Sequence, residues 1–266
     1  MNQSLWKLIQ PDYGSIAKDS IINGFLDHPY GLPGVECERC NQTWGGTKIL
    51  PYNCPEKFIK KKELKNSWPI SGSLHLKLRE EMELELEKQK IKINLLPGYD
   101  FQPNSLSISG PPKADFLWSN LGSFCVSERI KNIFEENKFV GAVFCPITIK
   151  KIGKGKGKLS PMKIKKFESE YELPIDENIN TNTQYHEMII TGESKRPFGS
   201  DIISECTLCG RQEYDDKKRK IEMKNEMWNG EDIFLLNTTL FKFISNRLKI
   251  ILENIRASNV WIEQWT

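Results

Sequence analysis

The chain has 266 residues, of which 38% are hydrophobic and 27% are charged. This composition supplies enough apolar material for one large domain or two small ones, and it excludes an intrinsically disordered chain. The 38 basic and 35 acidic side chains leave a formal net charge of only +3. Charge by itself therefore does not indicate a nucleic-acid or membrane-surface partner.

The N-terminal region does not have the pattern of a secretory signal peptide. Pro11, Asp12 and Gly14 follow before an apolar run of about 7 to 15 residues can form. No stretch approaches the ~20 apolar residues of a membrane span. We therefore expect a cytoplasmic protein with no membrane partner. In that compartment thiols are reduced and paired cysteines serve metals more often than disulfides, which the odd number of seven cysteines also favours.

The first long periodic segment runs from Leu74 to Ile91. Residues 1 to 30, before it, mix aromatic and turn residues and show no clear period. Apolar side chains then recur at every fourth position, at Leu74, Leu78, Met82 and Leu86. This spacing predicts a helix, for which Ser73 is the expected N-cap. Alternating leucines at its start also suit a strand, but the length and the Glu, Lys and Leu content favour the helix.

The middle of the chain predicts a second helix followed by a strand. Pro97-Gly98 and Pro111-Pro112 first divide the preceding segment into short extended pieces. Ser127 can cap a helix that runs through Asn137. The mostly apolar run from Val140 to Ile149 predicts a single buried strand.

A similar pattern recurs 118 positions later, where Ser245 to Glu253 resemble Ser127 to Glu135. The flanking apolar pairs correspond without a gap, as Phe116-Leu117 with Phe234-Leu235 and Val143-Phe144 with Trp261-Ile262. We interpret the chain as an α+β fold with two strand-helix-strand halves, residues 1–149 and 150–266, related by a weak internal repeat. The alternative, that any amphipathic helix followed by a strand looks alike, stays open.

A lysine-rich segment, Lys150 to Lys166, lies between the two halves. It holds eight lysines and no aromatic residue, whereas a nucleic-acid groove usually interleaves aromatic side chains for stacking. We expect a solvated loop rather than a nucleic-acid site. After it, Phe167, Ser169, Tyr171 and Leu173 alternate with charged residues and predict a half-buried strand.

Two C-x-x-C pairs carry the clearest chemical signal. Cys37 and Cys40 form the first pair, and Cys206 and Cys209 form the second. Structural zinc takes four ligands in a tetrahedron, often all thiolates, and a two-residue spacing lets one tight turn present two of them. The sequence therefore predicts one structural zinc ion in a zinc-ribbon-like site that joins the halves into one globular unit.

The residue after each pair supports a knuckle-shaped turn. Gly210 follows the second pair and can take a positive φ without strain. Asn41 follows the first pair, and asparagine is among the non-glycine residues most able to do the same. Because residues 41 to 205 separate the pairs, the metal would be a long-range clamp, unlike a compact zinc module with both pairs within about 20 residues.

Other interpretations of the cysteine pairs remain open. A thioredoxin-type redox pair precedes an apolar helical face, which neither pair does. A catalytic zinc site would recruit His or a carboxylate and leave one position open, but His28, His75 and His186 lack ligand spacing. Two independent sites, or none, are further alternatives.

No catalytic constellation can be recognised in the rest of the sequence. The lone cysteines, Cys54, Cys125 and Cys145, are expected to pack as small hydrophobic side chains. The alternating glycines at Gly153, Gly155 and Gly157 precede no predicted helix, so a phosphate-binding loop is not expected. We therefore predict a protein that is not an enzyme.

Several short motifs resemble the double-CXXCG motif family, a myxobacterial paralogous family associated with immunity to swarm-inhibition toxins. The resemblance rests on five segments in the family's order: Leu32 to Trp44, Leu96 to Phe101, Val126 to Arg129 with the following strand, Cys206 to Gly210, and Asp232 to Trp265. It covers nearly the whole chain. Asn41 in place of a glycine and the lysine-rich segment depart from the family pattern.

The resemblance implies that Cys37, Cys40, Cys206 and Cys209 are the family's paired cysteines. It also implies an immunity protein that binds and neutralises a cognate protein toxin. A zinc-ribbon nucleic-acid-binding or adaptor protein is the alternative, and it would show salt-dependent affinity for DNA or RNA. A thiol oxidoreductase would instead cycle one cysteine pair.

Overall fold

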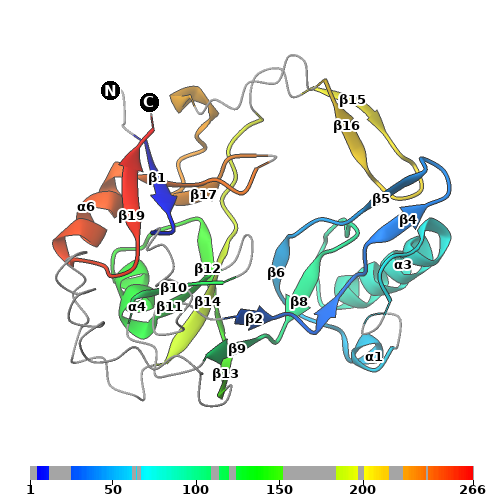
Figure 1. The fold of residues 1–266 in the computed structure, drawn as a ribbon, viewed down its shortest axis with the longest axis horizontal. Helices are drawn as coiled ribbons and strands as arrows, with labels where there is room; N and C mark the ends of the chain where they lie inside the picture. Colours follow the sequence, from blue (N-terminus) through cyan, green and yellow to red (C-terminus); the bar gives the residue numbers. More distant parts are fainter. Residues whose placement is uncertain are drawn as a thin grey trace. The chain divides into compact units, whose positions relative to one another are not determined.

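The computed structural model describes residues 5–11, 25–61, 64, 67–108, 114–119, 124–151, 184–196, 201–215, 224–237 and 239–265. The strand predicted at Phe167 to Leu173 and the lysine-rich segment after Lys151 lie outside these residues. The chain folds into two compact units (Figure 1): unit 1 comprises Met1–Asp27, Ser105–Pro197 and Glu222–Thr266, and unit 2 comprises His28–Asn104 and Phe198–Ile221.

The division at residue 149 is therefore wrong. Both predicted strand-helix-strand segments lie in unit 1, and both cysteine pairs lie in unit 2. The reason is non-local strand pairing: β1 (Leu5–Ile9), at the start of the chain, pairs with β18 (Lys242–Ser245) and β19 (Trp261–Gln264) near its end. Local sequence patterns do not show which distant strand will supply a pairing edge.

Unit 1 contains two four-stranded antiparallel sheets with the same plan. Their orders are β10-β11-β14-β12 and β17-β18-β1-β19. The strands not yet given are β10 (Phe116–Trp118), β11 (Phe124–Ser127), β12 (Ala142–Pro146), β14 (Tyr185–Ile190) and β17 (Ile233–Leu235). Helix α4 (Glu128–Glu136) follows β11, and α6 (Asn246–Asn254) follows β18. A third sheet, β13-β9-β2, and a short 3₁₀ helix complete the described part: β13 (Thr148–Lys151), β9 (Ser105–Ile108), β2 (Phe25–Asp27) and η2 (Asn225–Met227).

The central strands of the two sheets have matching registers. In β14, His186 lies opposite Val126 of β11 and Pro146 of β12. In β1, Trp6 lies opposite Ile244 of β18 and Gln264 of β19. Ile244 lies 118 positions after Val126, and Gln264 lies 118 positions after Pro146, which is the offset of the sequence pattern. The first strands, β10 and β17, differ from each other by one residue in their pairing.

The cap predicted at Ser127 is confirmed, and Ser245, its counterpart 118 positions later, caps the second unit 1 helix in the same way. Ser127 Oγ accepts a hydrogen bond from the Ile130 N–H of α4, and Ser245 Oγ accepts one from the Leu248 N–H of α6. The predicted end of the first helix at Asn137 is also confirmed, since Asn137 is its C-cap. An accepting hydroxyl satisfies one of the free N–H groups of the first turn.

A buried aspartate links each sheet to its helix. Asp115 binds Arg129 through Oδ2 and Nη2 at 2.6 Å, and Asp232 binds Arg247 at the same distance. Each arginine also reaches the C-cap carbonyl of the other helix, because Arg129 donates to Ile255 O and Arg247 donates to Asn137 O, both at 3.3 Å. The two strand-helix motifs are thus joined reciprocally, and cations at helix C-termini are favourably placed.

The segment from Val140 to Ile149 differs from its prediction. It forms two strands, β12 and β13, instead of one. β12 is the last strand of its sheet and only Cys145 in it is fully buried. Ala142 and Phe144 are only partly buried against the core and Val143 is exposed, which an apolar run alone does not distinguish from a buried strand.

Unit 2 is built around helix α3 (Gly72–Lys88) and three small sheets, β3-β8-β6, β5-β4-β7 and β15-β16. The strands are β3 (Tyr30–Gly31), β4 (Val35–Cys37), β5 (Gln42–Trp44), β6 (Ile49–Asn53), β7 (Ile70–Ser71), β8 (Asp100–Gln102), β15 (Ile202–Glu205) and β16 (Gln212–Tyr214), with the short helix α1 (Glu56–Ile59). The apolar face of α3 packs Leu78, Met82 and Leu86 into one core with Phe58 and Phe101.

The predicted helix is confirmed, but its predicted cap is wrong. Ser71, rather than Ser73, is the N-cap of α3 and accepts from the Leu74 N–H. The helix starts earlier because β7 ends directly at Ser71, alongside β4. Among the described residues, no helix is long and apolar enough to cross a membrane.

Candidate metal centre

The first cysteine pair lies in the turn between β4 and β5. These strands pair antiparallel with Cys37 opposite Gln42, and the Asn41 N–H donates to Cys37 O at 2.8 Å. Asn41 has a φ of 52°, in the left-handed region. The turn therefore has the knuckle form for which a glycine or asparagine is needed at this position.

The second pair occupies an equivalent turn between β15 and β16. Gly210 N–H donates to Cys206 O at 2.8 Å, and Cys206 N–H donates to Arg211 O at 2.9 Å. Gly210 has a φ of 76°. Figure 1 shows this hairpin beside β4 and β5, although most of the chain separates them in sequence.

The two turns bring the four cysteine sulfurs together. All four Sγ atoms lie within 4.8 Å of one another. Two cross-pair distances are 3.8 Å for Cys37 to Cys206 and 3.7 Å for Cys40 to Cys209. A tetrahedron with zinc–sulfur bonds of about 2.3 Å has edges of about 3.8 Å. The sulfur positions and the all-thiolate chemistry therefore fit a four-coordinate zinc site.

N–H groups surround the sulfurs. The backbone N–H of Gln42 donates to Cys40 and that of Arg211 donates to Cys209. Trp44 Nε1 donates to Cys209 Sγ at 3.2 Å. Burial raises the pKa of the Cys209 thiol to about 12, and the hydrogen bonds from Arg211 and Trp44 oppose this rise. A bound cation displaces such thiol protons, and N–H donors then stabilise the thiolates.

The N-terminus of α3 supports the first turn. The Glu38 carboxylate, between the two cysteines of the pair, accepts hydrogen bonds from the N–H groups of Gly72 at 2.8 Å and Ser73 at 3.0 Å. It also accepts a hydrogen bond from the Ser73 hydroxyl. These bonds, led by that of the hydroxyl, lower the pKa of Glu38 to about 2. The positive end of the helix dipole also stabilises a carboxylate at this position.

Gly72 allows both turns to approach the helix. A Cβ atom at this position would lie 3.0 Å from Leu208 Cδ2, in the second turn, and 3.3 Å from Cys37 Sγ, in the first. It would also lie 2.9 Å from a Glu38 carboxylate oxygen. A side chain here would push at least one of these groups away.

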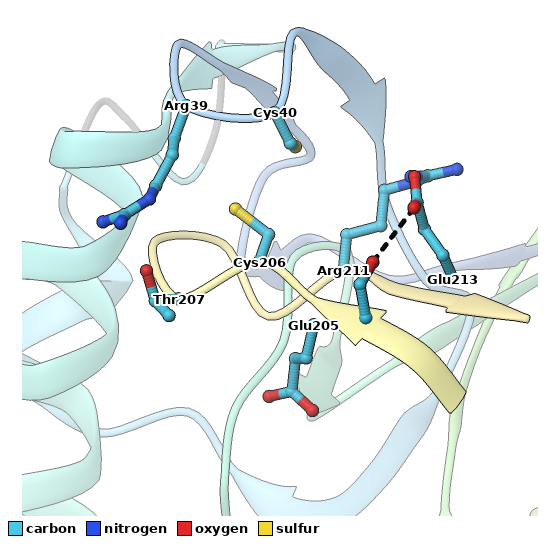
Figure 2. A pocket seen from close by; sticks show the side chains of 8 residues that line it. Arg39, Cys40, Glu205, Cys206, Thr207, Arg211 and Glu213 are labelled. Carbon is cyan, nitrogen blue, oxygen red and sulfur yellow. Dashed lines mark hydrogen bonds and ion pairs between the residues drawn. The ribbon is translucent and has the colours of Figure 1, made fainter. Parts of the chain in front are cut away.

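One side of the site opens to the surface (Figure 2). Cys40 and Cys206 are partly exposed and project into a pocket, whereas Cys37 and Cys209 are buried. Eight residues line this pocket: Arg39, Cys40, Ser204, Glu205, Cys206, Thr207, Arg211 and Glu213. Arg211 and Glu213 form an ion pair at 2.7 Å. The basic and acidic side chains of the rim are thus mixed.

The three histidines do not join the metal centre. Among the described residues, the four cysteines are the only cluster of His, Cys, Asp and Glu that could hold an ion. His75 is fully buried on α3, and burial followed by the charge of Arg79 lowers its pKa to about 4. His186 contacts Glu128 at the start of α4. Neither arrangement adds a metal ligand to the site.

The lone cysteines are buried, as their sequence context predicts. Cys54, Cys125 and Cys145 are at most 7% exposed, and each remains a free thiol. Burial raises the pKa of Cys54 and that of Cys145 to about 11, so both are protonated at neutral pH. A buried, protonated thiol is chemically inert.

The prediction that both cysteine pairs form one cluster is confirmed in its geometry. The four cysteines come from both predicted sequence halves, residues 1–149 and 150–266, but all of them lie in unit 2. Sequence reasoning missed Glu38, Trp44 and Gly72. A carboxylate inside a C-x-x-C turn and a glycine just before a predicted helix are signals that could have identified two of them.

Comparison with protein-family models gives no match for this chain, and comparison with curated proteins gives none either. The resemblance to the double-CXXCG motif family therefore stays a prediction.

Proposed function

We propose that unit 2 binds one structural zinc ion through Cys37, Cys40, Cys206 and Cys209. The observation that carries this proposal is the convergence of four sulfurs within 4.8 Å, from turns far apart in sequence. Four thiolates fill all the positions of a tetrahedral ion and leave none for water or a substrate. The proposed role of the ion is to stabilise the fold of unit 2. We therefore propose that the protein is not an enzyme.

The proposed function of the whole chain is immunity. It would bind a cognate protein toxin in the cytoplasm and neutralise it without turnover. This proposal is supported by the order of the motifs that resemble the double-CXXCG family, from Leu32 to Trp44 through Cys206 to Gly210. The closed ligand set is consistent with it, because a scaffold site needs no reactive position.

The charge of the metal centre argues against the nucleic-acid alternative. Phosphate contacts require unpaired Lys or Arg side chains on a common face. Around the second turn, Arg211 is paired with Glu213, and Glu205 lines the same pocket. Arg39 alone would not give a basic face. A protein partner therefore suits this region better than DNA or RNA does.

The proposal is tested with the protein product of the adjacent gene. We expect a 1:1 complex by calorimetry, protection of cells that express both proteins, and an unmodified toxin by mass spectrometry. Duplex DNA and single-stranded RNA, titrated at low and moderate salt, serve as controls. Tight, salt-dependent binding to either nucleic acid, with no binding to the toxin, would favour the adaptor alternative.

We also propose that the two sheets of unit 1 descend from one duplicated strand-helix-strand motif. The supporting observations are the shared offset of 118 positions and the equivalent aspartate–arginine pairs at Asp115 and Asp232. On this interpretation, β1 and β14 have exchanged sheets, since each lies in the centre of the sheet formed by the other copy. Equal effects of substituting the two aspartates would support it, and strongly unequal effects would not.

A further inference from the structure

An open groove runs along α3 in unit 2, and none of the four clustered cysteines lines it. Seven residues line it: Glu80, Glu83, Leu84, Glu87, Ile91, Lys92 and Ile93. Three are acidic, three are apolar and one is basic, so the groove is negative although the chain as a whole has a net charge of +3.

The acidic side chains of α3 belong to two rows with different surroundings. In the first row, Glu81 pairs with Lys61 at 2.8 Å, and Glu85 pairs with Lys88 at 2.9 Å. Lys57 lies 3.8 Å from both carboxylates. This row is therefore neutralised by the chain's own lysines, and it is a structural feature of unit 2.

The second row consists of Glu80, Glu83 and Glu87, which line the groove. The chain's own lysines do not neutralise it. Among the described ion pairs, none involves Glu80 or Glu87, and both side chains are exposed. The Glu83 carboxylate already has partners within the chain, because it accepts a hydrogen bond from the Leu95 N–H at 2.7 Å and lies 3.9 Å from Arg79. Two carboxylates thus remain available at the ends of the row.

Three apolar side chains, Leu84, Ile91 and Ile93, line the same groove as these two carboxylates. Leu84 is 60% exposed, which makes it one of the most exposed large apolar side chains of the described chain. Ile91 and Ile93 are half-buried and pack on the core of unit 2 from the groove side. Because they rest on a rigid core, a side chain placed against them would be desolvated without rearranging the fold.

We propose that this groove binds a basic amphipathic helix of the partner protein. An apolar side chain of that helix would lie against Leu84, Ile91 and Ile93, with Lys or Arg on both sides of it. Glu80 and Glu87 are seven residues apart on α3, which is about 10.5 Å along the axis. A partner helix with basic residues two turns apart could therefore reach both carboxylates.

Charge complementarity determines this choice of occupant. An acidic or purely apolar segment would leave Glu80 and Glu87 unpaired or repelled, whereas basic residues steer association and fix the register. The inference rests on the proposed function, in which the partner is the toxin, and it names the chemistry by which unit 2 would recognise that toxin.

The test uses the full chain and a synthetic helical peptide of leucine and lysine with leucines at every third or fourth position. A scrambled peptide of the same composition is the peptide control. We expect the wild-type chain to bind the patterned peptide at least tenfold more tightly than the scrambled one. We expect the double variant Glu80→Lys, Glu87→Lys to lose at least tenfold in affinity, and Leu84→Asp to lose a similar factor.

A matched variant, Glu136→Lys with Glu226→Lys, changes the total charge equally at exposed residues in unit 1. It should bind as the wild type does. Equal loss in this variant would show attraction by net charge only and would overturn the proposal. Unchanged binding by the groove variants would overturn it as well. Zinc content and melting temperature of each variant confirm that unit 2 remains folded.

The same variants are then titrated with the product of the adjacent gene. If the wild type binds the toxin and the groove variants bind it equally, the groove inference fails and the immunity function stands. If the wild type binds the patterned peptide at the groove but not the toxin, the immunity function fails and the groove remains a site for a basic helix. A rise in peptide affinity on changing Lys154, Lys156 and Lys158 to Ser would assign the groove to the chain's own lysine-rich segment and overturn the proposal.

Discussion

Replacing Cys209 by serine tests whether the metal centre holds unit 2 together. Cys209 is fully buried, its Sγ lies 3.7 Å from that of Cys40, and it accepts the Trp44 indole N–H. A serine hydroxyl at this position is a poor zinc ligand. We expect the variant to lose the ion and the turn between β15 and β16 to detach from β4 and β5.

The expected magnitude follows from the loop that the metal closes. The loop runs from Cys37 to Cys209, and a cross-link that closes a loop of this length restricts the unfolded chain by about 5 kcal/mol on the chain-entropy model. A typical domain is stable by only about 5 to 15 kcal/mol. The Cys209→Ser variant should therefore lose most of the stability of unit 2, and its melting transition should fall by about 20 °C or more.

Zinc content by elemental analysis and melting by calorimetry give the two readouts. The wild type should contain about one zinc ion per chain. Unit 1 holds none of the four ligands, so its transition serves as the internal reference. Cys54→Ser is the matched control, since Cys54 is also buried in unit 2 but lies outside the cluster. If Cys209→Ser keeps both the zinc ion and the wild-type melting curve, the metal does not hold unit 2 together.

Three further predictions follow from the packing of the two units. Gly72→Ala places a Cβ 3.3 Å from Cys37 Sγ and 3.0 Å from Leu208; it should destabilise unit 2 by about 1 to 3 kcal/mol and speed zinc loss to a chelator, and an unchanged loss rate would contradict it. Burial lowers the pKa of Lys242 to about 8, below its unfolded value of 10.5, so the native state binds fewer protons than the unfolded state between these values and stability should rise with pH there. Lys242→Met should remove that rise and stabilise unit 1 by about 1 to 3 kcal/mol at pH 7, as followed by chemical denaturation across pH; an identical pH slope in the variant would refute the assignment. Asp115→Asn and Asp232→Asn should each weaken a partly exposed arginine pair and a serine contact, with similar losses of about 1 to 3 kcal/mol in urea titrations; a loss confined to one variant would show that the two motifs are not equivalent.

The sequence determined those features that depend on neighbouring residues. Ser127 and Ser245 cap their helices because a hydroxyl needs only an N–H three residues ahead. The helix at Leu74 to Ile91 follows from the period of its leucines and forms as α3. The knuckle turns follow from Cys spacing with Asn41 and Gly210, both at positive φ.

Features that depend on partners distant in sequence were predicted less well. β1 showed no strand period because its two buried side chains, Leu5 and Leu8, are three positions apart, and its partners β18 and β19 are distant in sequence. Ser73 was predicted as the cap of α3, but β7 ends at Ser71, which is the N-cap, and the Ser73 N–H donates to Glu38. The division into residues 1–149 and 150–266 rested on the assumption that adjacent segments fold together. Each unit instead combines segments that are far apart in sequence.

The four cysteines of the candidate metal centre could thus be identified from the sequence alone, since thiolate chemistry and C-x-x-C spacing are local properties. Their meeting point was decided by the tertiary structure, which places both turns against the N-terminus of α3, where Gly72 leaves room for Cys37 and Leu208. The physical reason is that coordination chemistry belongs to individual side chains, whereas the distance between two turns depends on how every segment between them pairs and packs.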